Sequence, residues 1–112
     1  MPRAYYNEIL DAIYVIAVDC SFTEHRISDL IDLKERNYLG EGQKRYIGFN
    51  VNGARAFCKA KGLPSKGAVS IERILLTLNL CETNPRARGA IKEVAIPILE
   101  DNNLDMIEFP TD

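Results

Sequence analysis

Residues 68–109 read AVSIERILLTLNLCETNPRARGAIKEVAIPILEDNNLDMIEF, and this stretch carries the most regular pattern in the chain. Apolar residues recur every three or four positions over about 68–80 and again over about 85–101, which predicts two helices with one apolar face each. Asn84 and Pro85 suit the N-cap and the first position of the second helix. The first helix therefore ends in a tight turn before the second begins.

Residues 104–109 are apolar enough and short enough for a strand, and we expect a turn at Asn102–Asn103 before it. Pro97 lies inside the second helix, where it removes one amide donor, so a kink is expected near Glu93–Val94. The predicted order is helix, tight turn, helix, turn and strand. This is the order of a helix-turn-helix followed by the start of a wing.

Residues 85–110, PRARGAIKEVAIPILEDNNLDMIEFP, resemble the last helix and wing of winged-helix modules, and are similar to the C-terminal modules of Fic-type and related bacterial proteins. In such modules the N-terminal part of the second helix faces the DNA major groove. In this chain the matching part carries Arg86, Arg88 and Lys92, cations that suit guanine edges and phosphates. The resemblance thus implies DNA binding, although Asp105 and Glu108 make the wing acidic where bases are usual.

The N-terminal part of the chain predicts two further helices. Apolar residues recur at helical steps over about 3–19. Ser21 and Glu24 then match the capping box of a second helix, about 21–38, with Gly40 as its stop. The first of these helices offers a homodimer face, which would suit two-fold DNA sites, made of Tyr5, Tyr6, Ile13 and Tyr14.

Between these parts, residues 42–50 set β-favouring side chains among glycines, which indicates a short strand or hairpin arm. Asn52 resembles the cap of a short helix over 53–61, which Gly62 closes.

The fold class predicted from these elements is mainly α (α+β), helix-turn-helix or winged-helix-like, with a short β-hairpin or wing. A chain of 112 residues fits one domain, with 46% hydrophobic and 27% charged residues as in ordinary globular proteins. We divide it into an N-terminal helical part (1–40), a Gly-rich basic connector (41–67) and a winged-helix-like part (68–112).

Location and cofactors follow from what the sequence does not contain. No apolar run approaches the length of a membrane span, and the N-terminus does not resemble a signal peptide, so we expect a cytoplasmic protein without membrane contact. Three widely spaced cysteines, Cys20, Cys58 and Cys81, argue against a disulfide framework. Without paired ligands we expect neither a metal nor another cofactor.

Charge is distributed unevenly along the chain although its net value is −2. Residues 1–33 carry two bases and six acids, residues 34–92 carry twelve bases and four acids, and residues 93–112 carry six acids and no base. A strongly basic middle is a recognised hint of a nucleic-acid surface. The alternative is that the acidic ends fold back and neutralise the basic middle in surface ion pairs.

The second basic segment supplies further candidate contacts to nucleic acid. Its cations are Lys44, Arg45, Arg55, Lys59, Lys61 and Lys66. Tyr46, Phe49 and Phe57 are interleaved with them, a mixture that suits single-stranded nucleic acid, whereas the alternative places these rings in the core.

Catalysis is not expected, because His25 is the only histidine and the sequence contains neither G-x-x-x-x-G-K-[ST] nor G-x-G-x-x-G, the glycine-rich motifs that bind phosphates. The leading hypothesis is a winged-helix protein that binds nucleic acid, most simply duplex DNA, as a small regulator of transcription. The alternatives are a protein–protein interaction module, which the acidic wing and acidic ends favour, and a binder of single-stranded nucleic acid or RNA.

Overall fold

The computed structural model describes residues 2–101 and 104–111. Strands hold 33% of these residues and helices 31%. In chain order the elements are β1 (Arg3–Asn7), β2 (Ala12–Ile16), β3 (Phe22–Arg26), β4 (Ile31–Arg36), β5 (Tyr46–Asn52), α1 (Ala54–Ala60), β6 (Gly67–Ser70), α2 (Ile71–Cys81), α3 (Pro85–Glu100) and β7 (Met106–Phe109).

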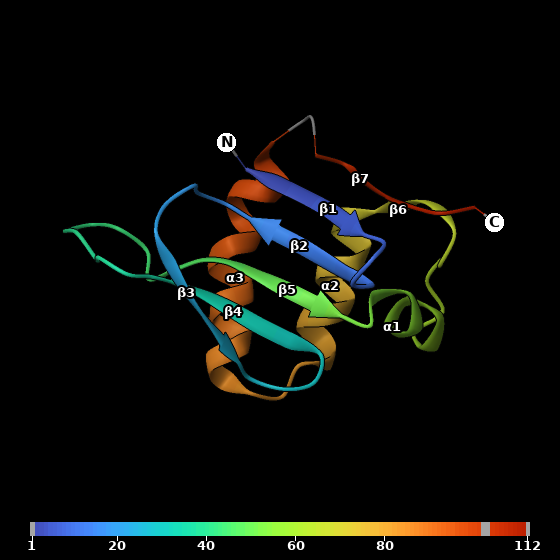
Figure 1. Cartoon of the computed structure of the whole chain (residues 1–112), viewed down its shortest axis with the longest axis horizontal. Coiled ribbons are helices and arrows are strands. Elements are labelled where there is room, and N and C mark those ends of the chain that lie inside the picture. The colour runs from blue at the N-terminus through green and yellow to red at the C-terminus, as the bar shows by residue number, and fades with distance from the viewer. Residues whose placement is uncertain (1, 102–103, 112) are drawn as a thin grey trace.

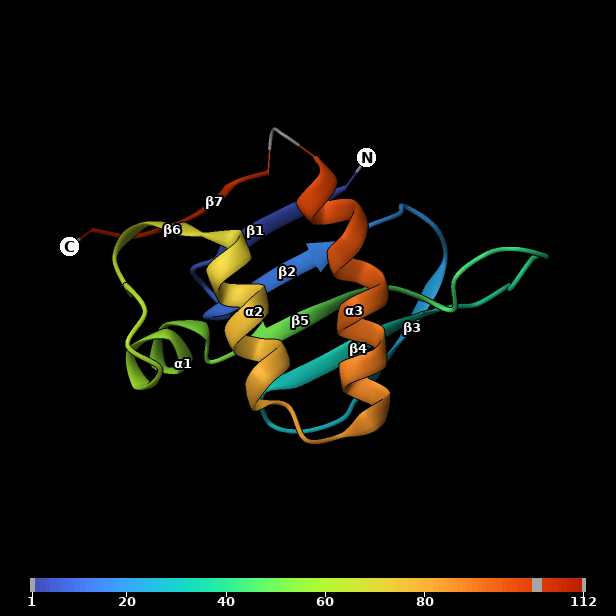
Figure 2. The same cartoon turned by 180° about the vertical axis from the view of Figure 1, so that it is seen from behind.

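The first five strands form one antiparallel sheet in the order β1-β2-β5-β4-β3. Helices α2 and α3 cover one face of this sheet, and Figure 1 shows the opposite face with no helix over it. Seen from behind, α2 and α3 lie side by side across the strands (Figure 2). None of the helices in the described part of the chain has the length and hydrophobicity that a membrane span requires.

The core lies between the sheet and the two helices. Alternate residues of the inner strands point into it, so each central strand contributes a pair of almost fully buried side chains: Ile13 and Val15, Phe49 and Val51, Ile31 and Leu33. The helices contribute Ile74, Leu78, Ile91, Val94 and Ile98 from their inner stripes. The helices are thus fixed by burial of one apolar face each against one face of the sheet.

The second sheet pairs β6 with β7 in antiparallel register. It lies at the β1 edge of the main sheet, where the ring of Phe109 packs edge-on against Tyr6 with 4.7 Å between ring centroids. The strand predicted over 104–109 is confirmed as β7, whereas the turn predicted at Asn102–Asn103 lies outside the described residues.

Three predicted helices are present with small changes at their ends. Asn84 caps α3, because its side chain accepts hydrogen bonds from the amides of Arg86 (2.9 Å) and Ala87 (3.2 Å). The helix continues through Pro97 to Glu100. The helix predicted over 68–80 begins only at Ile71, since the residues before it pair with β7. The short helix predicted over 53–61 is α1, with Gly53 as its N-cap, and the strand expected near 42–50 is β5.

The mainly helical fold class is wrong. The helix predicted over 3–19 is the hairpin β1–β2, and the one predicted over 21–38 is the hairpin β3–β4. The run from Ala12 to Ile16 is apolar on both faces of the sheet, so it matches a helical spacing as well as a strand. Residues 3–16 form strands, so the helical dimer face expected there is not formed, and Ile13, one of its expected members, is only 1% exposed in the core.

Gly48 and Gly89 provide a matched test of this packing. A Cβ on Gly48 would lie 2.5 Å from the backbone oxygen of Val15 on the paired strand, so Gly48→Ala forces the β2–β5 pair apart. We expect it to lower the free energy of unfolding by about 1–3 kcal/mol in urea denaturation. Gly89→Ala places its Cβ in open space within α3 and should raise that free energy by about 0.5–1 kcal/mol. Equal effects of the two changes would contradict the central placement of β5.

Candidate functional site

Residues 37–45 join β4 to β5 and form a projecting loop, here named the arm. Figure 1 shows the arm in green at the left, extending beyond the rest of the molecule, and Figure 2 shows it at the right. Its side chains Tyr38 and Leu39 are 82% and 53% exposed. A turn between Gly40 and Gln43 closes it, with a 2.8 Å hydrogen bond from the Gly40 amide to the Gln43 side chain. The arm therefore presents an aromatic and an aliphatic side chain to solvent.

Four cations gather where the arm leaves the sheet, and we name them the arm-base cations: Arg36, Lys44, Arg45 and Arg86. Two of them share Glu35, whose carboxylate lies 3.3 Å from Arg86 and 3.7 Å from Arg45. Arg86 also donates a 2.6 Å hydrogen bond to the hydroxyl of Tyr46. His25 completes the group, with its Nε2 atom 3.0 Å from the Glu35 carboxylate.

Three carboxylates lie beside the four arm-base cations: Glu35 at Arg45 and Arg86, and Glu93 and Glu100, which line one hollow with Arg36 and Lys44. Arg36 donates to the backbone oxygen of Lys44 at 3.1 Å, and the Lys44 ammonium lies 3.5 Å from the backbone oxygen of Glu93. Neither cation forms an ion pair with a carboxylate of residues 2–101 or 104–111. Glu41 is the one acidic residue of the arm itself. The arm base is therefore a surface that can accept an anion.

The structure distributes the nine predicted nucleic-acid contacts over three places. Arg45 and Arg86 meet at Glu35, and Lys44 lies at the other side of the arm base against the backbone of Glu93. Arg88 and Lys92 lie one turn apart on α3, and Lys92 lines a groove between α2 and α3. The other four lie on or near α1, at the far end of the molecule from the arm (Figure 1): Arg55, Lys59, Lys61 and Lys66.

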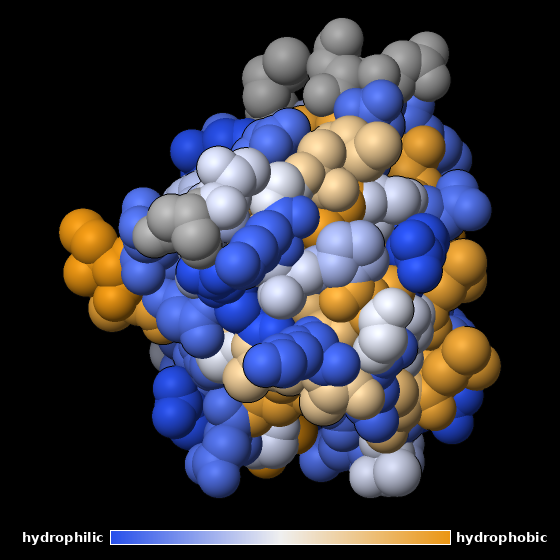
Figure 3. All heavy atoms as spheres, turned by 90° about the vertical axis from the view of Figure 1, so that its right-hand side faces the viewer, coloured by the Kyte–Doolittle hydropathy of each residue, from blue (hydrophilic) through white to orange (hydrophobic). Residues whose placement is uncertain are grey.

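The positive charges at the α1 end are dispersed over the surface. Figure 3 faces this end and shows a mainly hydrophilic surface with hydrophobic side chains near both margins. Arg55 is held by its own chain, since its Nε atom donates to the backbone oxygen of Ser65 at 3.0 Å. Because α1 follows β5 and the arm precedes it, the whole length of β5 separates the two groups of cations.

The aromatic rings interleaved with these cations are mostly part of the core. Phe49 is fully buried, Phe57 is 8% exposed, and Tyr46 is bound to Arg86. The alternative that placed these rings in the core is therefore correct for Phe49 and Phe57. Neither ring is available for stacking on a base.

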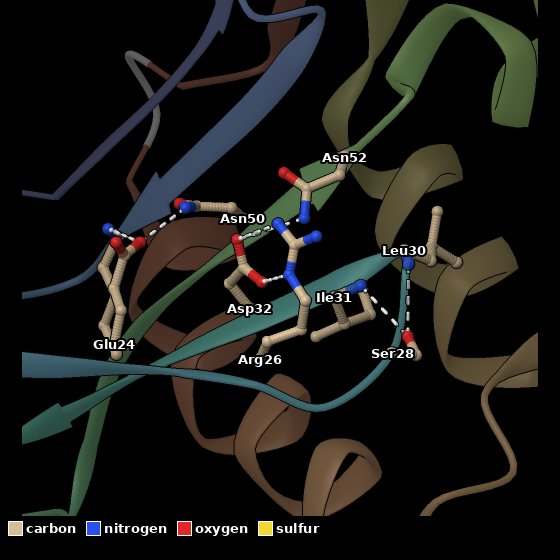
Figure 4. A network of polar contacts seen from close by, with 9 residues as sticks. Glu24, Arg26, Ser28, Leu30, Ile31, Asp32, Asn50 and Asn52 are labelled. Carbon is tan, nitrogen blue, oxygen red and sulfur yellow. Dashed lines mark hydrogen bonds and ion pairs between the residues drawn. The ribbon is translucent and has the colours of Figure 1, made fainter.

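Sequence reasoning did not find the polar network on the uncovered face of the sheet. Asp32 accepts hydrogen bonds from Arg26 at 2.8 Å and from Asn52 at 3.1 Å, and Figure 4 shows these three side chains converging across β3, β4 and β5. Burial of the Asp32 carboxyl acts to raise its pKa, but the hydrogen bonds from Arg26 and Asn52 outweigh burial and hold the pKa below its usual value. Alternation along residues 31–36 was the signal for this network, because it places every second side chain on that face.

Lys34 is the most buried charge of this network. The Lys34 side chain crosses Gly48 on the neighbouring strand β5, and a Cβ added to Gly48 would lie 3.1 Å from the Cδ atom of Lys34. Only 5% of Lys34 is exposed. Its ammonium lies 2.8 Å from Glu24 and 4.6 Å from the ring centre of Phe22. Glu24 also accepts a 2.6 Å hydrogen bond from Asn50. The predicted capping residue Glu24 is thus a strand residue whose carboxylate pairs with a buried cation.

The Cys58 thiol and the Tyr6 hydroxyl have raised pKa values and so stay protonated at neutral pH. Burial raises the pKa of the Cys58 thiol to about 11. Burial, followed by a 2.6 Å hydrogen bond to Asp11, raises the pKa of Tyr6 to about 12. The residues with the strongest case for function are therefore the arm-base cations.

Comparison with known proteins adds no family to this description. No protein-family model matches the chain, and no curated protein or solved structure matches it either.

The lowered pKa of Asp32 predicts a pH-dependent contribution to stability. A group whose pKa is lower in the folded state stabilises that state above its usual pKa, near 4, and loses this effect as the pH falls through the folded-state pKa. We expect Asp32→Asn to lower the free energy of unfolding by about 1 kcal/mol at pH 7, a value reduced by the exposure of Arg26. The deficit should shrink steadily below about pH 4. Urea denaturation between pH 7 and pH 2 measures it, with Asp29→Asn at an exposed turn as control; a deficit independent of pH would show that Asp32 acts through packing alone.

Proposed function

We propose that this protein binds duplex DNA through the arm and the arm-base cations. The observation that carries the proposal is the gathering of four cations at the base of a projecting loop: Arg45 and Arg86 share the Glu35 carboxylate, and Arg36 and Lys44 contact backbone oxygens beside it. Lys44, Arg45 and Arg86 come from segments about 40 residues apart in sequence, as the Tyr46–Arg86 hydrogen bond shows. Folding thus concentrates charge that the sequence distributes.

The projection and chemistry of the arm suit a DNA groove. A major groove admits a two-stranded ribbon as well as a helix, and phosphates flank it on both sides. In the proposed complex the arm enters the groove with Tyr38, while the guanidinium groups of Arg36 and Arg45 contact the phosphates beside it. This mode replaces insertion of α3, because Arg86 near the start of that helix is held by Tyr46 and Glu35 of the sheet.

Single-stranded nucleic acid is the weaker alternative. Binding to single strands uses several stacked rings beside a basic track. Of the three rings considered for this role, Phe49 and Phe57 lie in the core and Tyr46 is bound to Arg86. Tyr38, which was not among them, is a single exposed ring on the arm. We therefore place duplex DNA first.

Protein binding is a second candidate function, and the observation that favours it lies on the helices. Leu76 and Leu80 of α2 are 54% and 83% exposed, and Ile96 and Leu99 of α3 are 52% and 44% exposed. Adjacent helices that expose large apolar side chains on their outer face offer a surface suited to another protein.

The DNA proposal predicts a steep dependence of affinity on salt. If all four arm-base cations contact phosphates, the logarithm of the association constant should fall with the logarithm of salt concentration with a slope of about −3 to −4. Lys44→Ala with Arg45→Ala should remove about two units of that slope. Fluorescence anisotropy with a labelled mixed-sequence duplex, titrated at several salt concentrations, measures both quantities.

The control removes the same charge from the other end of the molecule. Lys59→Ala with Lys61→Ala, both exposed at α1, should leave the slope and the affinity unchanged. Absence of duplex binding at low salt, or equal losses from the two double variants, would rule out the arm as the binding surface. Tighter binding to a single strand of the same sequence would favour the alternative instead.

A further inference from the structure

The outer face of α2 and α3 is apolar at its centre. A groove of about 300 Å³ runs between the two helices, lined by Leu75, Leu76, Asn79, Ile91, Lys92, Ala95, Ile96 and Leu99. Leu76, Ile96 and Leu99 are each about half exposed although their neighbours Leu75 and Ile91 are buried. These helices therefore carry a second apolar stripe in addition to the one that packs on the sheet.

One end of this face is acidic. The start of α2 and the end of α3 lie together there, with Glu72, Leu99, Asp101 and Asp105 lining a second hollow of about 330 Å³. Leu99 lines both hollows, so the acidic end is continuous with the apolar centre. Glu100 is exposed beside it, and Arg73 is the basic residue of the first turn of α2.

The other end of the face is basic. Arg88 and Lys92 are exposed one helical turn apart on the N-terminal half of α3, and Lys92 reaches the apolar groove. Neither forms an ion pair within the part of the chain that the structure describes. Glu82 in the α2–α3 turn is the half-buried acid at this end. The order along the helices is thus acidic end, apolar centre, basic end.

This order makes the face complementary to itself. A two-fold axis that lies in the interface and crosses the helices sets the apolar centre against its own copy and the basic end against the partner's acidic end. A two-fold axis that runs along the helices would set acid on acid and base on base. Charge therefore selects the antiparallel arrangement.

From this geometry we infer that a second copy of this chain docks on the α2–α3 face, with the two helix pairs antiparallel across a two-fold axis. The inference gives the second candidate function its partner and does not depend on DNA binding. Helix α3 is about 24 Å long, so the face is at the small end of specific interfaces and the dimer should depend on concentration.

Sedimentation equilibrium without nucleic acid, from low to high micromolar protein, tests the inference. We expect a monomer–dimer equilibrium for the wild type and at least tenfold weaker association for Leu76→Glu with Ile96→Glu. Ile9→Glu, at a β1–β2 turn residue that is 94% exposed, is the control for an apolar side chain outside the face and should leave association unchanged. A wild-type chain that is monomeric at every concentration would overturn the inference, whereas failure of the DNA proposal would be seen only in the duplex titration.

A charge exchange then tests the antiparallel arrangement. Arg88→Glu with Lys92→Glu makes both ends of the face acidic, and Glu72→Lys with Asp105→Lys makes both ends basic. Each variant alone should associate at least tenfold more weakly than the wild type. An equimolar mixture should restore association as a heterodimer, because every end then faces the opposite charge.

All four exchanged residues are exposed, so circular dichroism should show folding unchanged. Two variants that each dimerise like the wild type, or a mixture that fails to restore association, would contradict the two-fold arrangement.

Discussion

Pairing of β5 on both of its edges is the constraint on which the rest of the structure depends. β2 and β4 each form an antiparallel ladder with β5, so the backbone hydrogen bonds of this strand are made within the sheet. One face of β5 is then apolar and close to fully buried, with Phe49 and Val51 beneath the helices. The opposite face is small or polar, with Gly48 allowing Lys34 to cross the strand and Asn50 bound to Glu24. Strand β5 thus contributes apolar side chains to the covered face of the sheet and small or polar residues to the uncovered face.

The length of β5 also determines how charge is distributed over the surface. The arm leads into the start of the strand and α1 follows its end, so the basic middle of the sequence is divided between opposite ends of the molecule. Counting charges along the sequence did not reveal this division. Arg86 joins the arm-base cations through a long-range contact, since it binds Glu35, which is 51 positions away in the sequence.

The three helices and the strands β5 and β7 were predicted from local sequence, but the pairing of the strands was not. The Asn84 cap and Pro85 begin α3 as expected, because a cap needs only residues within one turn of the helix. The hairpins β1–β2 and β3–β4 were predicted as helices. Ser21 and Glu24 fit a capping box by spacing, but Glu24 binds Lys34 and Asn50, which lie 10 and 26 positions away. Likewise, the sequence indicated Arg86, Lys44 and Arg45 as single cations, whereas the Glu35 carboxylate that Arg86 and Arg45 share could not be found without the sheet.

The two faces of the main sheet differ in how their polar groups are satisfied, and this difference locates function. On the uncovered face, Lys34 pairs with Glu24, Arg26 with Asp32, and Arg3 with Asp19, so a partner that docked there would have to disrupt ion pairs already formed. Removing Glu24 would leave the buried ammonium of Lys34 without its carboxylate partner, which is destabilising. The helical side exposes leucines, and at the arm base Arg36 and Lys44 form no ion pair with a carboxylate of the described residues, so a partner docking there would disrupt fewer ion pairs. The two proposed binding surfaces are therefore those with fewer ion pairs already formed, and the ion pairs of the uncovered face contribute to the stability of the sheet.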